Sequence, residues 1–398
     1  MDYPQALAGL HGLQVFGMRP GLERIGELLR RLGCPEREIG RYIHIAGTNG
    51  KGSTAAMLDA MLRAAGLRCG LFTSPHIHDH RERYRVDGEL IKEAEFAALF
   101  ARVAAAIRGM ELAGRESPTE FEAATAIALL HFAESGVQTA VMETGLGGRQ
   151  DSTNIIAADI AVLTDIGYDH MQVLGPALAG IAAEKAGIVK PGSSVFSAAQ
   201  APEAMAEIEA ACERQGARLQ VLGREIRLDE PILSLAGSSF SLHTTRRDYD
   251  CLFLPLLGRH QAQNAALAVA AAEQAGLAPA AIRQGLRQTV WPGRLELISR
   301  EPAILLDGAH NQPGMAALAQ ALKDYWPGKR VLLLLGMLAD KQREQAMAEI
   351  LPLTQGLILT PPANSRSGDW QQMAAYARGY GRDALCVEDN LQAAETAL

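Results

Sequence analysis

The sequence predicts an α/β protein with a mostly parallel sheet covered by helices on both faces, followed by a smaller Rossmann-like α/β domain. Three observations support this prediction. Strand-sized apolar segments alternate with segments of helical periodicity, and a glycine-rich turn joins the first apolar strand to a helix. The alternation then restarts after the hinge-like segment 291–294. With 398 residues, 48% of them hydrophobic, the chain is long enough for two domains, which we place at 1–295 and 296–398.

The individual elements follow in chain order. Strands of the large sheet are predicted at residues 43–46, 69–73, 139–143, 160–164, 194–197 and 219–222. Residues 224–255 contain short segments and turns, which predict a small antiparallel region before an alanine-rich helix at 260–273. In the second domain we expect strands at 303–306, 331–335 and 356–360, with a helix at 314–325 after the first of them.

Composition excludes several classes of protein. A net charge of −7 argues against a nucleic-acid partner. We find no apolar run of bilayer length and no basic-then-apolar signal segment, so we expect no membrane partner and a cytoplasmic location. The five cysteines are far apart and form no C-x-x-C pair, so neither disulfides nor a zinc site is expected from them.

The segment 42–54, YIHIAGTNGKGST, is the most informative in the chain. An apolar strand runs into a turn, and a helix is predicted to begin at Ser53. Glycines let backbone N–H groups approach a phosphate chain, and a helix N-terminus favours negative charge. Lys51 would reach the outer phosphates and Ser53 would ligate Mg²⁺. The match to the P-loop pattern is imperfect because Gly52 separates Lys51 from Ser53, and the alternative is a glycine turn with a solvated lysine.

Polar residues follow other predicted strands at their carboxyl ends, where parallel sheets collect catalytic groups. Glu143 ends one such strand and is placed to coordinate the Mg²⁺ of a nucleotide, and His170 follows the neighbouring strand. Ser74 ends a strand beside the glycine loop, so its hydroxyl is a further candidate ligand. Asp307 and His310 end the first strand of the second domain and indicate a site there.

Three histidines at alternate positions, His76, His78 and His80, resemble a metal-binding strand face. Pro75 and the charged residues that follow favour an exposed loop instead, and no role is assigned to His78 or His80.

The order of these clusters resembles the folylpolyglutamate synthase and dihydrofolate synthase family, a branch of the Mur ligase superfamily. The matching segments are HIAGTNGKGST, FTSPHI, TEFEAATA, ETGLGGRQDSTN, DHMQVLG, EKAGIVKPG, LLGRHQAQNAALA, WPGRLE, ILLDGAHN and LLLLGMLADK. The resemblance implies an ATP-dependent ligase that joins L-glutamate to tetrahydrofolate, to dihydropteroate or to both, through an acyl phosphate, with release of ADP and phosphate. It further implies a monomer that uses Mg²⁺, with a need for K⁺ left open.

The resemblance also implies roles for particular residues. Lys51, Lys185, Asp307 and His310 would be catalytic, and Lys185 would be carbamylated. ATP would contact Gly47, Thr48, Asn49, Gly50, Lys51, Gly52, Ser53, Asn264, Arg294 and Asp307. The metal would be held by Ser74, Glu143 and His170. The pterin end of the folate would face Thr119, Glu120, Phe121, Glu122, Gln150, Asp151 and Ser152, although Glu120 stands where the family often has an aromatic residue.

Two alternatives remain open at this point. A cell-wall ligase of the same superfamily would act on a UDP-linked precursor, but the chain starts almost directly with the glycine-loop domain. A nucleotide-dependent switch would turn over ATP without any amino acid.

Overall fold

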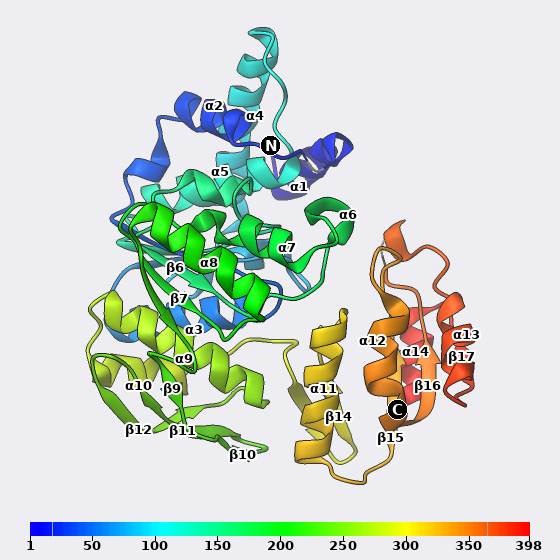
Figure 1. The fold of residues 1–398 in the computed structure, drawn as a ribbon. Coiled ribbons are helices and arrows are strands. Elements are labelled where there is room, and N and C mark those ends of the chain that lie inside the picture. The colour runs from blue at the N-terminus through cyan, green and yellow to red at the C-terminus, as the bar shows by residue number, and fades with distance from the viewer. Residues whose placement is uncertain (18, 364) are drawn as a thin grey trace.

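The computed structural model describes residues 1–17, 19–363 and 365–398, and its larger part is built on one eight-stranded sheet (Figure 1). The strands lie in the order β4-β3-β2-β5-β1-β6-β7-β8. From β2 to β8 all neighbours are parallel, whereas β3 and β4 add an antiparallel edge. The bounds are β1 Arg41–Ala46, β2 Cys69–Phe72, β3 Tyr84–Val86, β4 Glu89–Leu90, β5 Thr139–Glu143, β6 Ile160–Leu163, β7 Ser194–Ser197 and β8 Arg218–Val221. The predicted fold class is confirmed.

Helices cover both faces of this sheet because its central strands are apolar on both sides. In β1, Ile43 and Ile45 pack with α3, α9 and α10, whereas Tyr42 packs with α1, α2, α4 and α5 on the opposite face. Ala46 contributes to the core under α7 and α8. The helix bounds are α1 Tyr3–His11, α2 Glu23–Arg31, α3 Lys51–Ala64, α4 Glu93–Leu112, α5 Glu120–Glu134, α6 Met171–Leu174, α7 Leu178–Lys185, α8 Pro202–Gln215, α9 Arg259–Gln274 and α10 Pro279–Arg287.

The helix after the glycine loop starts earlier than predicted. It begins at Lys51 rather than Ser53, with Gly50 as its N-cap in the left-handed region. Every residue from Ser53 to Leu62 is buried, because α3 is enclosed between the sheet, α9 and α10. The first turn of α3 is therefore held firmly beneath the loop.

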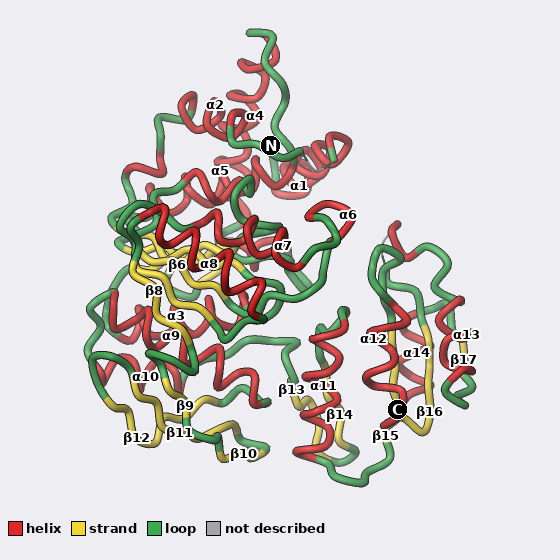
Figure 2. The backbone as a smooth tube through the Cα atoms, viewed as in Figure 1, coloured by secondary structure: helices red, strands yellow, loops and turns green. Residues whose placement is uncertain are grey.

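The predicted antiparallel region is confirmed as a separate small sheet, visible at the lower left of Figure 2. It comprises β9 Arg227–Leu228, β10 Ile232–Ser234, β11 Gly237–His243 and β12 Asp248–Leu254. Buried residues of β11 and β12, such as Phe240 and Leu252, join the core formed by α3 and α9. The small sheet thus covers the outer side of α9 and α10.

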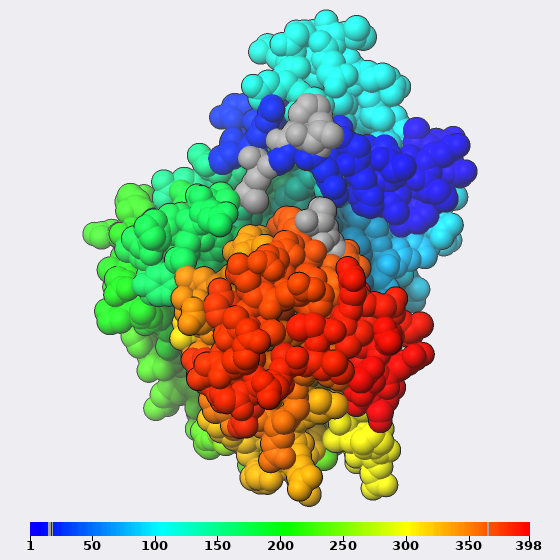
Figure 3. All heavy atoms as spheres, turned by 90° about the vertical axis from the view of Figure 1, so that its right-hand side faces the viewer, coloured from blue at the N-terminus to red at the C-terminus, as the bar shows by residue number. Residues whose placement is uncertain are grey.

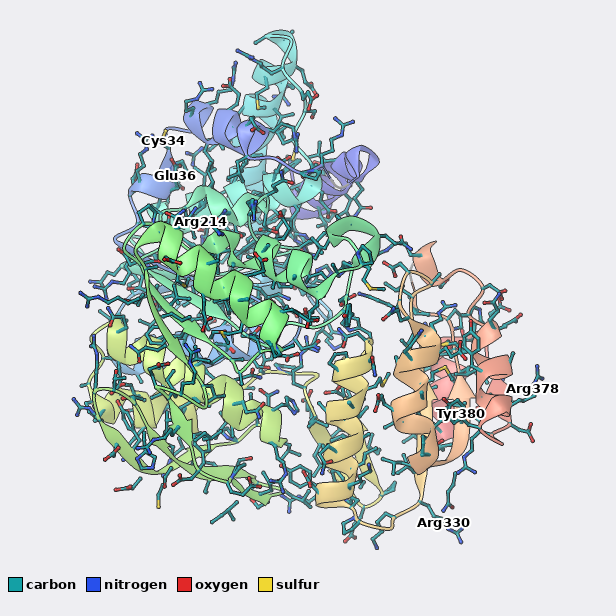
Figure 4. The ribbon with its side chains drawn as sticks, viewed as in Figure 1. Cys34, Glu36, Arg214, Arg330, Arg378 and Tyr380 are labelled. Atoms are coloured by element: carbon teal, nitrogen blue, oxygen red, sulfur yellow. The ribbon has the colours of Figure 1, made fainter. Side chains whose placement is uncertain are left out.

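The C-terminal part contains a three-stranded parallel sheet, in the order β15-β16-β17, with helices on both faces. Leu357 and Leu359 of β16 pack with α11, α12 and α13, whereas Ile358 packs with α14. The bounds are α11 Gln312–Tyr325, β15 Val331–Leu335, α12 Arg343–Ile350, β16 Thr354–Leu359, α13 Gln372–Gly379, β17 Ala384–Cys386 and α14 Asn390–Ala397. Figure 3 shows this part, in orange and red, standing beside the green N-terminal part and below the blue N-terminal helix. Arg330 and Arg378 lie at its outer edge (Figure 4).

The segment between the two parts corrects one prediction. Residues 303–306 were expected to start the parallel alternation of the second domain, but as β14, Ala303–Leu306, they pair antiparallel with β13, Glu296–Arg300. The hairpin packs on Leu257 and α11. A short turn after β13 makes this antiparallel pairing local, and the sequence pattern of β14 alone does not distinguish it from a parallel strand.

None of the described helices combines the length and apolar character that crossing a bilayer requires.

Candidate active site

A cleft of about 1400 Å³ lies between the two parts of the chain and is lined by residues from both. All the site residues predicted from the sequence line this one cleft. They are Gly47, Thr48, Asn49, Gly50, Lys51, Gly52, Ser53, Ser74, Thr119, Glu120, Phe121, Glu122, Glu143, Gln150, Asp151, Ser152, His170, Lys185, Asn264, Arg294, Asp307 and His310. Their lining the cleft supports a shared site, while the role of each residue remains a prediction.

The glycine loop is packed too closely to accept larger residues. Gly47 has φ +156°, and a Cβ there would lie 1.9 Å from Thr164 Oγ1. Gly50 has φ +87°, and a Cβ there would lie 2.4 Å from Asn264 Oδ1. No side chain of the described residues caps the first turn of α3. This helix N-terminus faces the cleft with its backbone N–H groups uncapped, which is the arrangement that binds phosphate.

Two lysines meet beneath the loop. Lys51 Nζ donates to the carbonyl oxygens of Gly47 and Thr48 at 3.1 and 3.2 Å, and Lys185 Nζ donates to the same Gly47 oxygen at 2.8 Å. Lys185 is the last residue of α7 and is buried, with 5% of its surface exposed. Burial, and then the charge of Lys51, lower the pKa of Lys185 to about 7.

Glu143 is the acidic residue of the cleft that is best suited to bind a metal ion. It is buried at the end of β5, and its Oε2 accepts a hydrogen bond from the backbone N–H of Ser74 at 3.0 Å. Burial raises the pKa of the Glu143 carboxyl, and Lys51 opposes this rise. Two oxygen-bearing side chains beside a glycine loop fit Mg²⁺, which prefers oxygen ligands.

His170 fits this ligand set less well, since its Nε2 lies 3.4 Å from Lys341 Nζ. Burial lowers the pKa of His170 to about 4, so the ring is neutral at pH 7. In this structure His170 therefore belongs to a polar cluster that joins the two parts of the chain.

Asp169, which follows the same predicted strand as His170, is the centre of that cluster. Its Oδ1 accepts from Lys341 Nζ at 2.7 Å and its Oδ2 accepts from Asn311 Nδ2 at 3.1 Å. His310 Nε2 lies 3.7 Å from Oδ2. Burial opposes ionisation, but the nearby His310 ring and the hydrogen bond from Lys341 hold the pKa of the Asp169 carboxyl well below its usual range.

Asn311 extends the same connection to the glycine loop. Its side-chain amide and that of Asn49 exchange hydrogen bonds at 3.2 Å. Lys341 and Asn311 stand in the segments LLLLGMLADK and ILLDGAHN, but only their tertiary contacts distinguish them from other polar residues there.

The remaining predicted site residues, Asp307 and His310, lie near the start of the C-terminal part of the chain. Asp307 Oδ2 accepts from the backbone N–H of Leu295 at 2.9 Å, which ties β14 to the segment containing Arg294. His310 Nδ1 donates a hydrogen bond to the carbonyl oxygen of Gly308 at 2.8 Å, and Nε2 faces the Asp169 carboxylate. His260, half-buried at the start of α9, also lines the cleft and was not predicted.

The predicted folate-binding residues fall into two groups. Glu122 and Asp151 are buried and accept hydrogen bonds from nearby groups: Glu122 from the N–H of Thr119 at 2.7 Å and Asp151 from the N–H of Leu146 at 2.8 Å. Both side chains are part of the cleft wall. Glu120, Phe121 and Gln150 also line the cleft and retain more exposed surface.

The histidine segment differs from the exposed loop that was predicted. His78 is exposed, but His80 begins the 3-10 helix η3, His80–Arg83, and is buried with 4% of its surface exposed. The charged residues after Pro75 are half-buried, and the His80 ring packs among the aromatic rings of Tyr84 and Phe96.

Comparison with known protein families agrees with this geometry. Residues 45–272 match the Mur ligase middle domain, and residues 293–398 match the Mur ligase glutamate ligase domain. The chain is thus an ATP-dependent ligase of the Mur type.

Individual relatives identify the family within the Mur ligases to which the chain is similar. A Bacillus subtilis dihydrofolate synthase/folylpolyglutamate synthase is 42% identical over 85% of this chain and 80% of the relative, and the Mycobacterium tuberculosis protein of the same name is 35% identical over 94% and 81%. A crystal structure of M. tuberculosis folylpolyglutamate synthase complexed with ADP and AMPPCP covers all of this chain and 91% of that one, with TM-score 0.91 and 34% identity. Escherichia coli FolC in complex with DHPP and ADP aligns over the same shares, with TM-score 0.90 and 31% identity.

The chain belongs to the folylpolyglutamate synthase/dihydrofolate synthase family, whose reaction is the ATP-dependent addition of glutamate to folates.

Proposed function

We propose that this chain adds L-glutamate both to dihydropteroate and to tetrahydrofolate, using one cleft and one acyl-phosphate chemistry. The observation that carries the proposal is the continuity of the cleft, which runs from the glycine loop past Lys185 and Glu143 to Phe121. Its volume of about 1400 Å³ exceeds the roughly 300–1,000 Å³ of a pocket for one small molecule. A nucleotide and a second substrate can therefore be held together.

The chemistry follows from the groups at the loop. A carboxylate is a poor electrophile, so the γ-phosphoryl group of ATP is transferred to it and ADP leaves. The N–H groups at the start of α3 and the Lys51 ammonium stabilise the charge on the transferring phosphoryl group. The amine of glutamate then attacks the acyl carbon, and the tetrahedral intermediate collapses to an amide with release of phosphate.

The C-terminal part supplies the groups for the second step. The amine must lose a proton as the C–N bond forms, and His310 is the candidate acceptor because it lines the cleft and its ring is oriented by Gly308 and Asp169. Asp307 and Arg294 line the cleft at the junction of the two parts, where they can hold the nucleotide. The Lys341–Asp169 ion pair keeps both parts in the closed arrangement that positions the reactants.

Ser74 and Glu143 would hold the Mg²⁺ of the nucleotide. When bound, the ion neutralises phosphate charge and polarises the transferring group. In this arrangement Glu143 needs to be ionised, and its raised pKa would fall beside a divalent cation.

Lys185 has the properties that carbamylation requires. A lysine with a pKa of about 7 is largely unprotonated at slightly alkaline pH, and only the neutral amine forms a bond to the carbon of CO₂. The product is a carbamate anion, with one proton released to solvent. The change from cation to anion would replace the repulsion between Lys185 and Lys51 with attraction.

The test is ADP release measured with dihydropteroate or tetrahydrofolate, each with and without L-glutamate. We expect turnover with either pteroate compound only when glutamate is present. Turnover with one compound alone would restrict the chain to a single activity. ADP release that ignores both additions would favour the switch, and turnover with a UDP-linked precursor would favour the cell-wall ligase, but the matches over most of the chain to folate enzymes support neither alternative.

A further inference from the structure

Three side chains from distant segments meet at the edge of the cleft. His11 is the last residue of α1, His80 is the first residue of η3, and Glu120 is the first residue of α5. One nitrogen of each histidine and one carboxylate oxygen of Glu120 all lie within 4.8 Å of one another. His11 Nε2 is 3.7 Å from Glu120 Oε1, and the two histidine ring centroids are 5.7 Å apart.

The buried histidine of this cluster lacks protein partners. Among the described residues, neither ring nitrogen of His80 has a hydrogen bond, although the residue is only 4% exposed. A buried polar atom left unpaired costs about 1–3 kcal/mol, so native structures rarely keep one without a reason. The neighbouring rings of Tyr84 and Phe96 contact His80 but leave both nitrogens unpaired.

The remaining histidine nearby is already engaged. His76 Nδ1 accepts a hydrogen bond from Arg83 Nε at 3.1 Å, although its ring lies 5.2 Å from that of His80. His78 is exposed. The cluster therefore differs from the alternate-histidine pattern visible in the sequence, because its other members come from α1 and α5.

The protonation state of His80 suits a metal ligand. Burial, followed by the charge of Arg83, lowers the pKa of His80 to about 3, so its ring is neutral at pH 7. Neutral imidazole with a free lone pair is the form that coordinates metal. Two imidazole nitrogens and one carboxylate oxygen form a ligand set typical of Zn²⁺ sites that keep a fourth position open, whereas Mg²⁺ prefers oxygen.

We propose that His11, His80 and Glu120 bind a divalent transition-metal ion such as Zn²⁺. This site is separate from the site that would hold the Mg²⁺ of the nucleotide. Ligand atoms at about 2.0–2.1 Å from zinc stand roughly 3.3 Å apart, so closure of the site requires shifts of about 1 Å. The His11 side chain is 44% exposed and can make that movement. The bound ion would link the end of α1 to the start of α5, where Glu120 lies in the cleft wall.

The test is a titration of the metal-free full chain with Zn²⁺ by calorimetry, in excess Mg²⁺, repeated with Co²⁺ to record its visible absorption. We expect one equivalent of Zn²⁺ to bind, a Co²⁺ spectrum typical of low coordination number, and a rise in melting temperature with Zn²⁺. His80→Phe and His11→Ala should each weaken Zn²⁺ binding at least tenfold, since even loss of a partner outside the ligand shell costs about 10–100-fold.

The controls separate this site from other histidines. Phenylalanine fills the aromatic pocket of His80, so His80→Phe should melt no lower than the wild type without metal and should show no rise with Zn²⁺. His78→Ala and His170→Ala should bind Zn²⁺ as the wild type does. The proposal is overturned if the wild type binds no Zn²⁺, if His80→Phe and His11→Ala bind it normally, or if His170→Ala loses it.

Discussion

Lys51 and Lys185 donate hydrogen bonds to the same oxygen, the carbonyl of Gly47, at 3.1 and 2.8 Å. Two ammonium groups held this close repel each other, and the repulsion adds to burial in lowering the pKa of Lys185. The pair concentrates positive charge beneath the glycine loop, where an anion would relieve the repulsion.

Lys51→Ala should reduce ADP release with glutamate and a pteroate substrate by about a hundredfold or more, because removing one donor to a transition-state charge typically costs that much. The fold should be unaffected, since the Lys51 side chain contacts loop carbonyls and adds nothing to the core. Circular dichroism and melting temperature check the fold. Lys323→Ala, at an exposed position of α11, is the matched control and should retain activity. Full activity in Lys51→Ala would remove the loop assignment.

Lys185→Ala should abolish turnover, and short carboxylates such as formate should restore part of it if the wild-type residue carries a carbamate. The carboxylate would replace the lost anion in the space vacated by the side chain. Lys185→Arg should stay inactive with the same additives because arginine keeps its charge and fills the space. Initial rates with and without additive are the measurement, and wild-type rates in unsupplemented Lys185→Ala would contradict the role.

The stability of the chain should depend on pH through Lys185. Its pKa is about 7 when folded and about 10.4 in an unfolded chain. Below pH 7 both states hold the proton and the penalty of the buried ammonium is fully present. Between pH 7 and about 10.4 only the unfolded state binds it, so the folded state gains stability as pH rises.

Lys185→Met should remove this pH dependence of stability, because methionine does not titrate. In CO₂-free buffer, the variant should exceed the wild type in unfolding free energy most at pH 6, and the difference should shrink towards pH 10. Urea unfolding at several pH values measures it. A difference that stays constant with pH would show that Lys185 does not titrate in this window.

Gly50→Ala should weaken nucleotide binding at least tenfold. Alanine at φ +87° is strained by about 1–2 kcal/mol, and its Cβ would lie 2.4 Å from Asn264 Oδ1. Gly66→Ala is the matched control because Gly66 has φ +74° with open space around it. Binding of an ATP analogue and melting temperature are measured for both. Equal loss of affinity in the two variants would mean that backbone strain alone, and not the close approach of the loop, is responsible.

Asp169 and Lys341 should be energetically coupled across the cleft. Their side chains are only 10% and 7% exposed, and removing one partner leaves the other charge buried without compensation. Asp169→Asn and Lys341→Met should each destabilise the chain, and the double variant should lose less than the sum. A coupling of about 0.5–3 kcal/mol in a double-mutant cycle is expected. Additive effects would indicate that the pair does not hold the two parts together.

The local pattern of the sequence was sufficient for the large sheet and the glycine loop. The central strands are apolar and bounded by polar or glycine residues, so their periodicity alone predicts buried parallel strands. Candidate residues such as Glu143 and Ser74 could be found because strand ends are marked in the sequence, and the carboxyl ends of parallel strands meet at one edge.

Other features depend on contacts between residues far apart in the chain. The antiparallel pairing of β14, the burial of His80, and the meeting of Asp169 with Lys341 have no local signature. Charge and hydropathy describe each residue, but a pKa or a ligand set is determined by neighbours that the fold brings from other segments. The sequence therefore determined the architecture, the family and the candidate residues, whereas the tertiary structure decided which of them touch, because those contacts span up to 262 positions along the chain.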